Sequence, residues 1–382
     1  MNDLLRMTSK ERVLCAIQHR PMDRVPVNYL GTPETDAKLR SYFGIDLSVE
    51  PEPPGGTVEY DWDILGCLGA DLRALRLPYR GPAIPTFDDG RAQDIFGVTY
   101  RPVSNEVGTY LESATLPYAS FATVTDVKAY PWPDPAWFDY SALPPQCEQW
   151  KDYAVVYGSV GNVDLINGTA FGRGVEQTIM DIALEDPVGL AVMEKRFEFG
   201  HEQTRLALEA CGGKVDIVWM GDDYGTQRGL LMSPAKWRKL FRAKLRAMID
   251  LAHKHGARLM LHSCGSTRQI WPDFVDIGLD IYDTVQPSAA GMVPNELAAE
   301  FGRNICLHGT INTQSTLPYG TPSDVRKEVR DRIESFGNRG GLIVAPCHNV
   351  QPDTPIENVL ALYREAGSLG SVASQRIAQP VS

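Results

Sequence analysis

The stretch ARLMLHSCG (residues 257–265) is an apolar run that ends on a histidine and a cysteine, with one serine between them. Side chains alternate between the two faces of a β-strand, so His262 and Cys264 are predicted to share one face, where a glycine ends the strand. An isolated pair with this spacing is more often a hydrogen-bonded core histidine beside an inert buried thiol. Other parts of the sequence are therefore needed to distinguish this interpretation from a metal site.

Apolar runs of the same kind recur along the second part of the chain and alternate with helical stretches. The runs are AVVYGSVG (154–161), DIVWMGDD (216–223), ARLMLHSCG (257–265), DIYDTVQP (280–287), NICLHGTIN (304–312) and GLIVAPCHN (341–349). Helix starts are indicated by a capping residue before a proline, at Asp186, Ser233, Thr321 and Thr354, and Glu357 completes a capping box with Thr354.

Nearly all-apolar strands that alternate with helices are typical of a parallel sheet covered by helices. With an earlier strand at Val25–Leu30, the pattern predicts an α/β fold, a (β/α)₈ TIM barrel with an N-terminal helical and hairpin extension. An open, doubly wound sheet is the alternative. The absence of a G-x-G-x-x-G segment after the first strand disfavours it.

The first 150 residues are less regular. Thr8 and Glu11 fit the capping box of a first helix, and DDGRAQDIFGVTYRPV (88–103) is predicted to form a hairpin that turns at Asp89-Gly90. We expect residues 1–150 to be an N-terminal extension that contributes the first strand and the hairpin. Residues 151–370 should form the main part of the barrel, and residues 371–382 a flexible tail.

The composition excludes some classes of partner. The chain has 382 residues, a net charge of −11 and seven scattered cysteines. Nucleic acid and anionic membranes need basic surfaces, so neither is expected to be a partner. The sequence has no transmembrane run and no signal-peptide pattern, and the odd number of cysteines indicates reduced thiols. We therefore expect a cytoplasmic protein with a small-molecule substrate; a homodimer is compatible with the sequence.

Polar residues gather where the apolar runs end. These ends read Gly221-Asp222-Asp223-Tyr224, His262-Ser263-Cys264, Gln286-Pro287-Ser288, His308-Gly309-Thr310 and Pro346-Cys347-His348-Asn349. In (β/α)₈ barrels the active site lies at the carboxyl ends of the strands. A site with three protein ligands of mixed nitrogen and sulfur type and one open position is typical of catalytic zinc. The candidate ligands are His262, Cys264, Cys347 and His348; the last two are neighbours that face opposite ways and are not expected to bind one ion together.

Other polar residues at the strand ends have a functional and a structural interpretation each. Asp222 or Asp223 is a metal ligand or general base, or else caps the following turn. His308 orients substrate or is a core histidine bonded to backbone. The remaining candidates for substrate binding, each with packing, capping or a solvated charge as its structural alternative, are Tyr157, Asn162, Arg228, Gln286 and Asn349.

Nearly the whole chain resembles the uroporphyrinogen decarboxylase superfamily, whose members share a (β/α)₈ barrel. The resemblance rests on SKERVLCAIQHRPMDRVPV (9–27), DIFGVTY (94–100), YPWPDP (130–135), GDDYGTQRGLLMSPAKW (221–237), LMLHSCG (259–265) and APCHNVQPDTPIENVLALYREAG (345–367). True decarboxylases have an arginine-rich motif near the N-terminus that binds the porphyrinogen carboxylates. The corresponding segment here, VPVNYLGTPETDAKL (25–39), lacks the arginine pair.

The other branch of the superfamily consists of zinc-dependent methyltransferases that act with corrinoid proteins, and their H-x-C motif matches His262 and Cys264. Their third ligand is a cysteine four residues before the proline of P-x-T-P. Before Pro352 that position is His348, and Cys347 is one residue early. The resemblance thus implies His348 as the third ligand, with Cys347 as its substitute. Decarboxylases also have a histidine at this position, so His348 fits both branches.

The resemblance implies a zinc-dependent methyltransferase that moves a methyl group between a small substrate and a corrinoid protein or another acceptor. His348 is a catalytic candidate from the resemblance, and Asp222 and Asp223 are candidates from their place at a strand end. A histidine in place of cysteine makes the ion less electron-rich, which favours O-methyl substrates. The chain lacks the corrinoid-binding D-x-H-x-x-G element, so cobalamin would come with a partner protein. The alternatives are a metal-free, decarboxylase-like lyase that uses His348 and an aspartate on a carboxylated substrate, and a non-enzymatic subunit that docks a corrinoid carrier.

Overall fold

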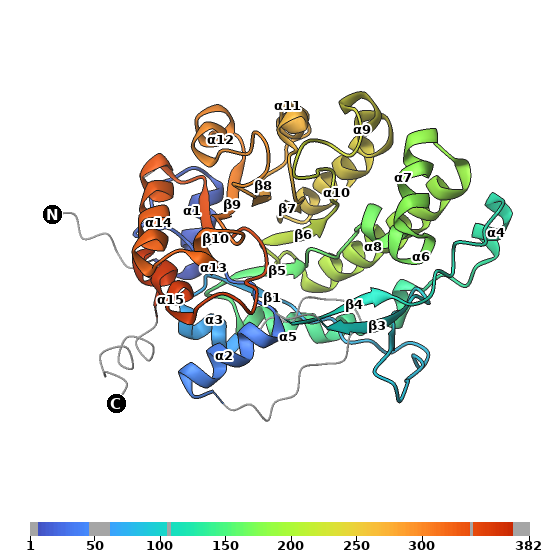
Figure 1. Cartoon of the computed structure of the whole chain (residues 1–382), viewed down its shortest axis with the longest axis horizontal. Helices are drawn as coiled ribbons and strands as arrows, with labels where there is room; N and C mark the ends of the chain where they lie inside the picture. Colours follow the sequence, from blue (N-terminus) through green and yellow to red (C-terminus); the bar gives the residue numbers. More distant parts are fainter. Residues whose placement is uncertain (1–6, 46–61, 105–107, 337–338, 370–382) are drawn as a thin grey trace.

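A computed structural model describes residues 7–45, 62–104, 108–336 and 339–369. Its centre is a parallel sheet of seven strands in the order β1-β5-β6-β7-β8-β9-β10, surrounded by helices (Figure 1). The strands are β1 (Leu72–Ala74), β5 (Ala154–Gly158), β6 (Ile217–Gly221), β7 (Arg258–His262), β8 (Ile281–Val285), β9 (Cys306–Ile311) and β10 (Leu342–Pro346). The prediction of an α/β fold with a parallel sheet is confirmed, and β5 to β10 coincide with the six apolar runs.

From β5 onward, helices follow the strands in the chain, and most helices lie outside the sheet. The longer ones are α1 (Ser9–Ile17), α2 (Pro33–Phe43), α7 (Val175–Leu184), α8 (Pro187–Cys211), α10 (Arg242–Lys254), α14 (Pro322–Phe336) and α15 (Ile356–Glu365). The shorter ones are α3 (Trp62–Leu68), α4 (Val124–Ala129), α5 (Leu143–Gln149), α6 (Ile166–Arg173), α9 (Pro234–Leu240), α11 (Trp271–Asp276), α12 (Pro294–Phe301) and α13 (Thr316–Tyr319), with the 3₁₀ turns η1 (Pro135–Trp137), η2 (Tyr140–Ala142) and η3 (Arg268–Ile270). No helix in the described ranges is long and apolar enough to cross a membrane.

Most of the predicted helix caps are present. The Thr8–Glu11 capping box begins α1, and the side chains of Asp186 and Ser233 accept backbone N–H groups at the starts of α8 and α9. The predicted cap at Thr354 is wrong. Helix α15 begins one residue later than predicted, with Pro355 as its N-cap residue and no side-chain cap; Thr354 precedes the cap, and its side chain is buried.

The predicted strand at Val25–Leu30 is formed only in part, so within the described residues the central sheet has seven strands, and the predicted closed barrel of eight is not confirmed. Val27 and Gly31 make isolated parallel bridges to Val344 and Val350, and the Asp71 N–H at the start of β1 donates to the Val27 carbonyl. The segment therefore lies between the two edges of the curled sheet. It does not form a regular ladder because the Val27 N–H donates to the Asp71 carboxylate and not to a neighbouring strand.

A small antiparallel sheet lies outside the parallel one and consists of β2 (Ala92–Gln93), β3 (Thr99–Ser104) and β4 (Thr109–Ser113). The predicted hairpin is therefore present, but β2 and β3 are joined through residues 94–98. The predicted turn at Asp89-Gly90 lies between Thr86 and Ala92, which form an isolated bridge. The tail predicted at 371–382 lies outside the described residues.

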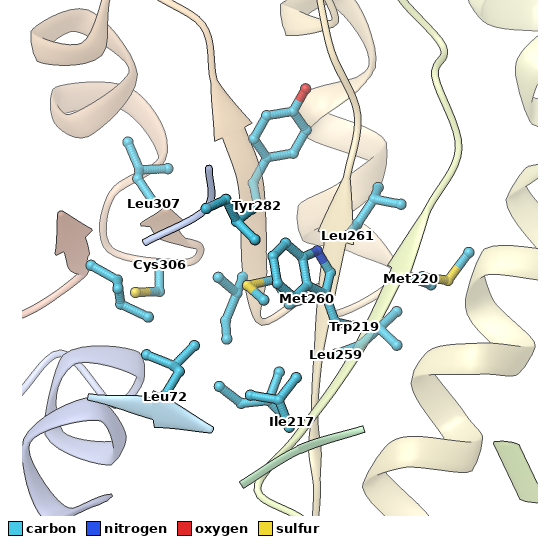
Figure 2. Packing of buried hydrophobic residues seen from close by; sticks show 14 of the residues in the cluster. Leu72, Ile217, Trp219, Met220, Leu259, Met260, Leu261, Tyr282, Cys306 and Leu307 are labelled. Atoms are coloured by element: carbon cyan, nitrogen blue, oxygen red, sulfur yellow. The ribbon is translucent and has the colours of Figure 1, made fainter. Parts of the chain in front are cut away.

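The core fills the space that the strands surround. Figure 2 shows Ile217, Trp219 and Met260 gathered in this space, whereas Met220 points away from it; all four side chains are almost fully buried. Residues two apart on a strand share a face, so Trp219 lies on the same inner face of the sheet as Ile217. The ring of His308, on β9, is 6.0 Å from the Trp219 ring and lies on this inner face as well. The apolar interior thus ends in polar side chains at the carboxyl ends of the strands.

Candidate metal centre

Three potential ligands meet where β6 and β7 end. One donor atom each of Asp223, His262 and Cys264 lies within 4.8 Å of the others. The Cys264 Sγ atom is 3.4 Å from Nε2 of His262, and the Cys264 backbone N–H donates to Oδ1 of Asp223 at 2.7 Å. The structure thus brings together the two residues of the H-x-C motif and one of the two candidate aspartates. Nitrogen, sulfur and oxygen donors converge on one point.

The imidazole of His262 is oriented by Asp283, the central residue of β8. Nδ1 of His262 is 2.7 Å from Oδ2 of Asp283, which leaves Nε2 directed at Cys264. Metal-bound histidines usually have a carboxylate or carbonyl on the nitrogen that does not bind the metal. The sequence interpretation missed Asp283. Its signal was a single carboxylate inside the apolar run IYDTV, where a buried charge is rare without a partner.

The charges of the centre depend on one another. Burial would raise the pKa of Asp283, but His308 and His262 together lower it well below its usual value. Burial would lower the pKa of His262, whereas the Asp283 carboxylate and the Cys264 thiol raise it. Burial also raises the pKa of Cys264, but hydrogen bonds with His262 and His348 lower it overall. These surroundings favour the thiolate, which is the form of cysteine that binds metals.

The neighbours Cys347 and His348 differ in their surroundings. His348 is exposed, and its ring centroid is 6.3 Å from that of His262. Cys347 is fully buried, its Sγ atom lies 3.4 Å from the Thr313 hydroxyl, and burial raises its pKa to about 11. His348 is therefore the residue of this pair that the structure brings next to the cluster.

Two further carboxylates lie next to Asp223. Asp222 is 1% exposed and accepts the Ile166 N–H at the start of α6, and burial together with the charge of Asp164 raises its pKa well above the usual value. Burial and the charge of Asp223 raise the pKa of Asp164 to about 6. Asn167 donates to Oδ2 of Asp223 at 3.0 Å. Asp164 and Asn167 were missed, since nothing distinguishes them from ordinary loop residues in the sequence.

The residues predicted to bind substrate are not all in one place. Gln286 lies against the H-x-C loop, where its side-chain oxygen accepts the Gly265 N–H at 2.9 Å. His308 is buried and bonded to Asp283 and Asn28.

The other four have different surroundings. Tyr157 is buried near Tyr140 and Cys211, and the Asn162 amide donates to the Trp219 carbonyl. Arg228 is exposed and Asn349 is half-buried.

The fold and the site define a class of protein: a helix-covered parallel sheet with histidine, cysteine and aspartate at its strand ends. The family model of uroporphyrinogen decarboxylase (URO-D) matches residues 174–368, just over half of the chain, and the chain belongs to this family. A solved structure of a methyltransferase from Methanosarcina mazei is similar over 94% of this chain and 98% of that one, with a TM-score of 0.67 and 18% sequence identity. At this identity, the likeness is one of fold. No curated protein matches the sequence.

Proposed function

We propose that the protein is a zinc-dependent methyltransferase that moves a methyl group between a small substrate and a corrinoid protein or another acceptor. The observation that supports this most directly is the approach of Cys264 Sγ to Nε2 of His262 at 3.4 Å, beside Asp223, at the carboxyl ends of two parallel strands. Strand ends of this kind are where barrel enzymes have their active sites.

The donor set fits zinc. In a tetrahedral site with Zn–N and Zn–S bonds of about 2.0 and 2.3 Å, a nitrogen and a sulfur ligand are about 3.5 Å apart. The observed 3.4 Å between His262 and Cys264 agrees with this separation. Asp283 occupies the other nitrogen of His262 at 2.7 Å, as expected for the partner of a metal ligand.

His262, Cys264 and Asp223 would hold the ion, and the fourth position would stay open for substrate. When bound, zinc would polarise an oxygen or a thiol of the substrate and so lower the barrier to methyl transfer. A site with one thiolate, one imidazole and one carboxylate is less electron-rich than a site with two thiolates, which favours activation of an oxygen leaving group. We therefore propose O-methyl compounds as the substrate class.

His348 lies at the exposed side of the cluster and has one of two roles. It is either the third protein ligand in place of Asp223, as the register before Pro352 predicts, or the group that exchanges a proton with the substrate oxygen. A ligand substitution removes metal, whereas the loss of a proton donor leaves metal bound and lowers turnover. Metal content and turnover of His348→Ala, measured side by side with Asp223→Asn, therefore assign the two roles.

The function is tested by metal analysis of the purified protein, followed by turnover. We expect about one zinc per chain and methylation of free cob(I)alamin by a methoxylated aromatic compound, both absent in Cys264→Ser. A wild-type protein that retains no zinc after purification and none after incubation with the metal would overturn the proposal. If the protein binds zinc but transfers no methyl group to cob(I)alamin, the metal site would be supported and the proposed methyltransferase reaction overturned.

The metal-free lyase remains the second candidate, because the matching family model is that of a decarboxylase. In that case His348 and the buried acid Asp222 would act on a carboxylated substrate. The lyase proposal requires carbon dioxide release by protein treated with a chelator. Dependence of all activity on added zinc argues against it.

A further inference from the structure

His308, on β9, is enclosed by protein and bonded at both ring nitrogens. It is 1% exposed, with Nδ1 2.7 Å from Oδ1 of Asp283 and Nε2 3.1 Å from the Asn28 amide nitrogen. A substrate would need at least one of these nitrogens. The surroundings of His308 thus point to a role inside the protein and away from direct contact with substrate.

The two oxygens of Asp283 are divided between two histidines. Oδ2 is 2.7 Å from Nδ1 of His262, and Oδ1 is 2.7 Å from Nδ1 of His308. An ionised carboxylate only accepts hydrogen bonds, so each Nδ1 has to carry a hydrogen. For His262 this leaves Nε2 as the nitrogen that can bind a metal, on the side of Cys264.

We propose that His308 is a positioning residue of the metal centre, which acts through Asp283 to hold His262 in its ligand orientation. This inference rests on the proposed metal-dependent function. Without a donor on Oδ1, the Asp283 side chain can rotate, and the imidazole of His262 loses its fixed partner. With His308 in place, one rigid arrangement is selected across β7, β8 and β9.

Asn28 extends the arrangement to the N-terminal part of the chain. It belongs to the segment that lies between the two sheet edges, and its backbone N–H donates to Val344 on β10. The ring of Trp219, 6.0 Å from that of His308, packs on the same side. The segment around Asn28 therefore contributes to the centre through His308, although it is far from the H-x-C motif in sequence.

The test compares the zinc affinity of two full-length variants, His308→Leu and His308→Asn, by competition with a chromophoric chelator. Leucine removes the donor to Asp283, whereas the asparagine amide can replace Nδ1–H. We expect zinc to bind about 10-fold more weakly in His308→Leu, the lower end of the effect of losing an outer partner of a metal ligand, because His308 contacts that partner, Asp283, and not His262 itself. In His308→Asn we expect most of the affinity to return. The visible spectrum of the cobalt(II)-substituted protein should shift in the leucine variant only.

Asp280→Asn is the matched control. Asp280 also forms a hydrogen bond with a histidine, since its Oδ2 is 2.7 Å from Nε2 of His253. This pair lies before β8, at the opposite end of the sheet from Cys264. Zinc affinity should be unchanged in this variant. If His308→Leu does not fold, Asn28→Ala takes its place, with a smaller expected loss of about 2–10-fold, since His308 loses only one of two partners.

The outcomes separate this inference from the proposed function. Wild-type protein that binds no zinc overturns the function itself. Wild-type protein that binds zinc, with the same affinity and cobalt spectrum in His308→Leu, overturns the positioning role alone. Loss of zinc in His308→Leu and His308→Asn alike also overturns it, because a general packing effect would then explain both.

Discussion

Cys264 Sγ lies 3.4 Å from Nε2 of His262, although the two residues are separated by Ser263 on the chain. The geometry follows from the alternation of side chains at the end of β7, since residues two apart point the same way. Ser263, between them, faces the other side, where its hydroxyl accepts the Tyr224 N–H at 3.0 Å. The short motif thus presents one face to the proposed metal centre and uses the other to hold the loop after β6.

The first prediction concerns these two ligands. His262→Ala and Cys264→Ser should each weaken zinc binding by at least about 100-fold, because a three-ligand site loses one of its donors. Cys264→Ser should keep the thermal unfolding temperature of chelator-treated wild-type protein within a few degrees, since residues at the strand ends are more often functional than stabilising. His262→Ala should lower that temperature, because it removes one partner of the buried Asp283 carboxylate. Metal content by mass spectrometry and thermal unfolding measure the two effects.

His253→Ala is the control, as His253 is also bonded to a carboxylate, Asp280, but lies away from the centre. It should keep full zinc. Full zinc in both His262→Ala and Cys264→Ser would show that the ion binds elsewhere.

The second prediction separates Cys347 from His348. Cys347 is fully buried against Thr313, so Cys347→Ser should leave zinc binding within about twofold of wild type and cost only about 1 kcal/mol of stability. His348→Ala should lower turnover by about 100-fold or more. Metal analysis of the purified variants measures zinc binding, and steady-state kinetics measure turnover. Loss of zinc in Cys347→Ser with a fully active His348→Ala would reverse the assignment.

The sequence predicted the six strands β5 to β10 and the meeting of His262 with Cys264, because both depend on local signals. Apolar runs of strand length and the two-residue repeat of a strand can be recognised without knowing any distant contact. The caps at Thr8, Asp186 and Ser233 are local in the same sense. Thr354 had the same signal, but its side chain is buried by tertiary packing and α15 begins one residue later than predicted, at Ile356.

The rest of the centre depends on contacts between distant residues. His308 is 25 residues from Asp283 and 280 residues from Asn28, and no spacing rule connects them. The incomplete strand at Val25–Leu30 has the same cause, since its Val27 N–H is taken by Asp71, 44 residues away. A single sequence contains each of these residues but not the pairing between them.

The third prediction uses the carboxyl group of Asp164, whose pKa is raised to about 6 by burial and by Asp223. A carboxyl group with a folded pKa above its unfolded value stabilises the fold fully below the unfolded value, and this contribution is lost as the pH rises through about 6. Asp164→Asn removes the charge and keeps the oxygen that accepts the Asn167 N–H. In chelator-treated protein, the variant should therefore gain stability relative to wild type as the pH rises from 5 to 8.

Thermal unfolding of Asp164→Asn and wild type at several pH values measures this gain. Asp139→Asn serves as the comparison, because Asp139 is a half-buried cap of the 3₁₀ turn η2 whose pKa is lowered, first of all by its bond with Ser141. Its stability difference from wild type should not move in favour of the variant at high pH. An Asp164→Asn curve parallel to that of wild type between pH 5 and 8 would refute the prediction.

The last prediction concerns Asp71, which holds the N-terminal segment against the sheet. Its buried carboxylate accepts hydrogen bonds from the guanidinium groups of Arg12 and Arg24, each at 2.7 Å, and from the Val27 N–H at 2.8 Å. Asp71→Ala leaves Arg24 without its buried counter-charge, while Arg12 keeps its bonds to Asp23. We expect a loss near the lower end of the roughly 3–5 kcal/mol that removing one partner of a buried ion pair costs. Urea unfolding should show this loss. The control is Glu209→Ala, which removes an exposed partner of Arg205 and should cost less than about 1 kcal/mol.

Asp71→Ala should also affect the metal centre, because Asn28 follows Val27 directly. A folded Asp71→Ala protein should therefore bind zinc more weakly than wild type. Equal zinc affinity would mean that the N-terminal segment keeps its place without Asp71.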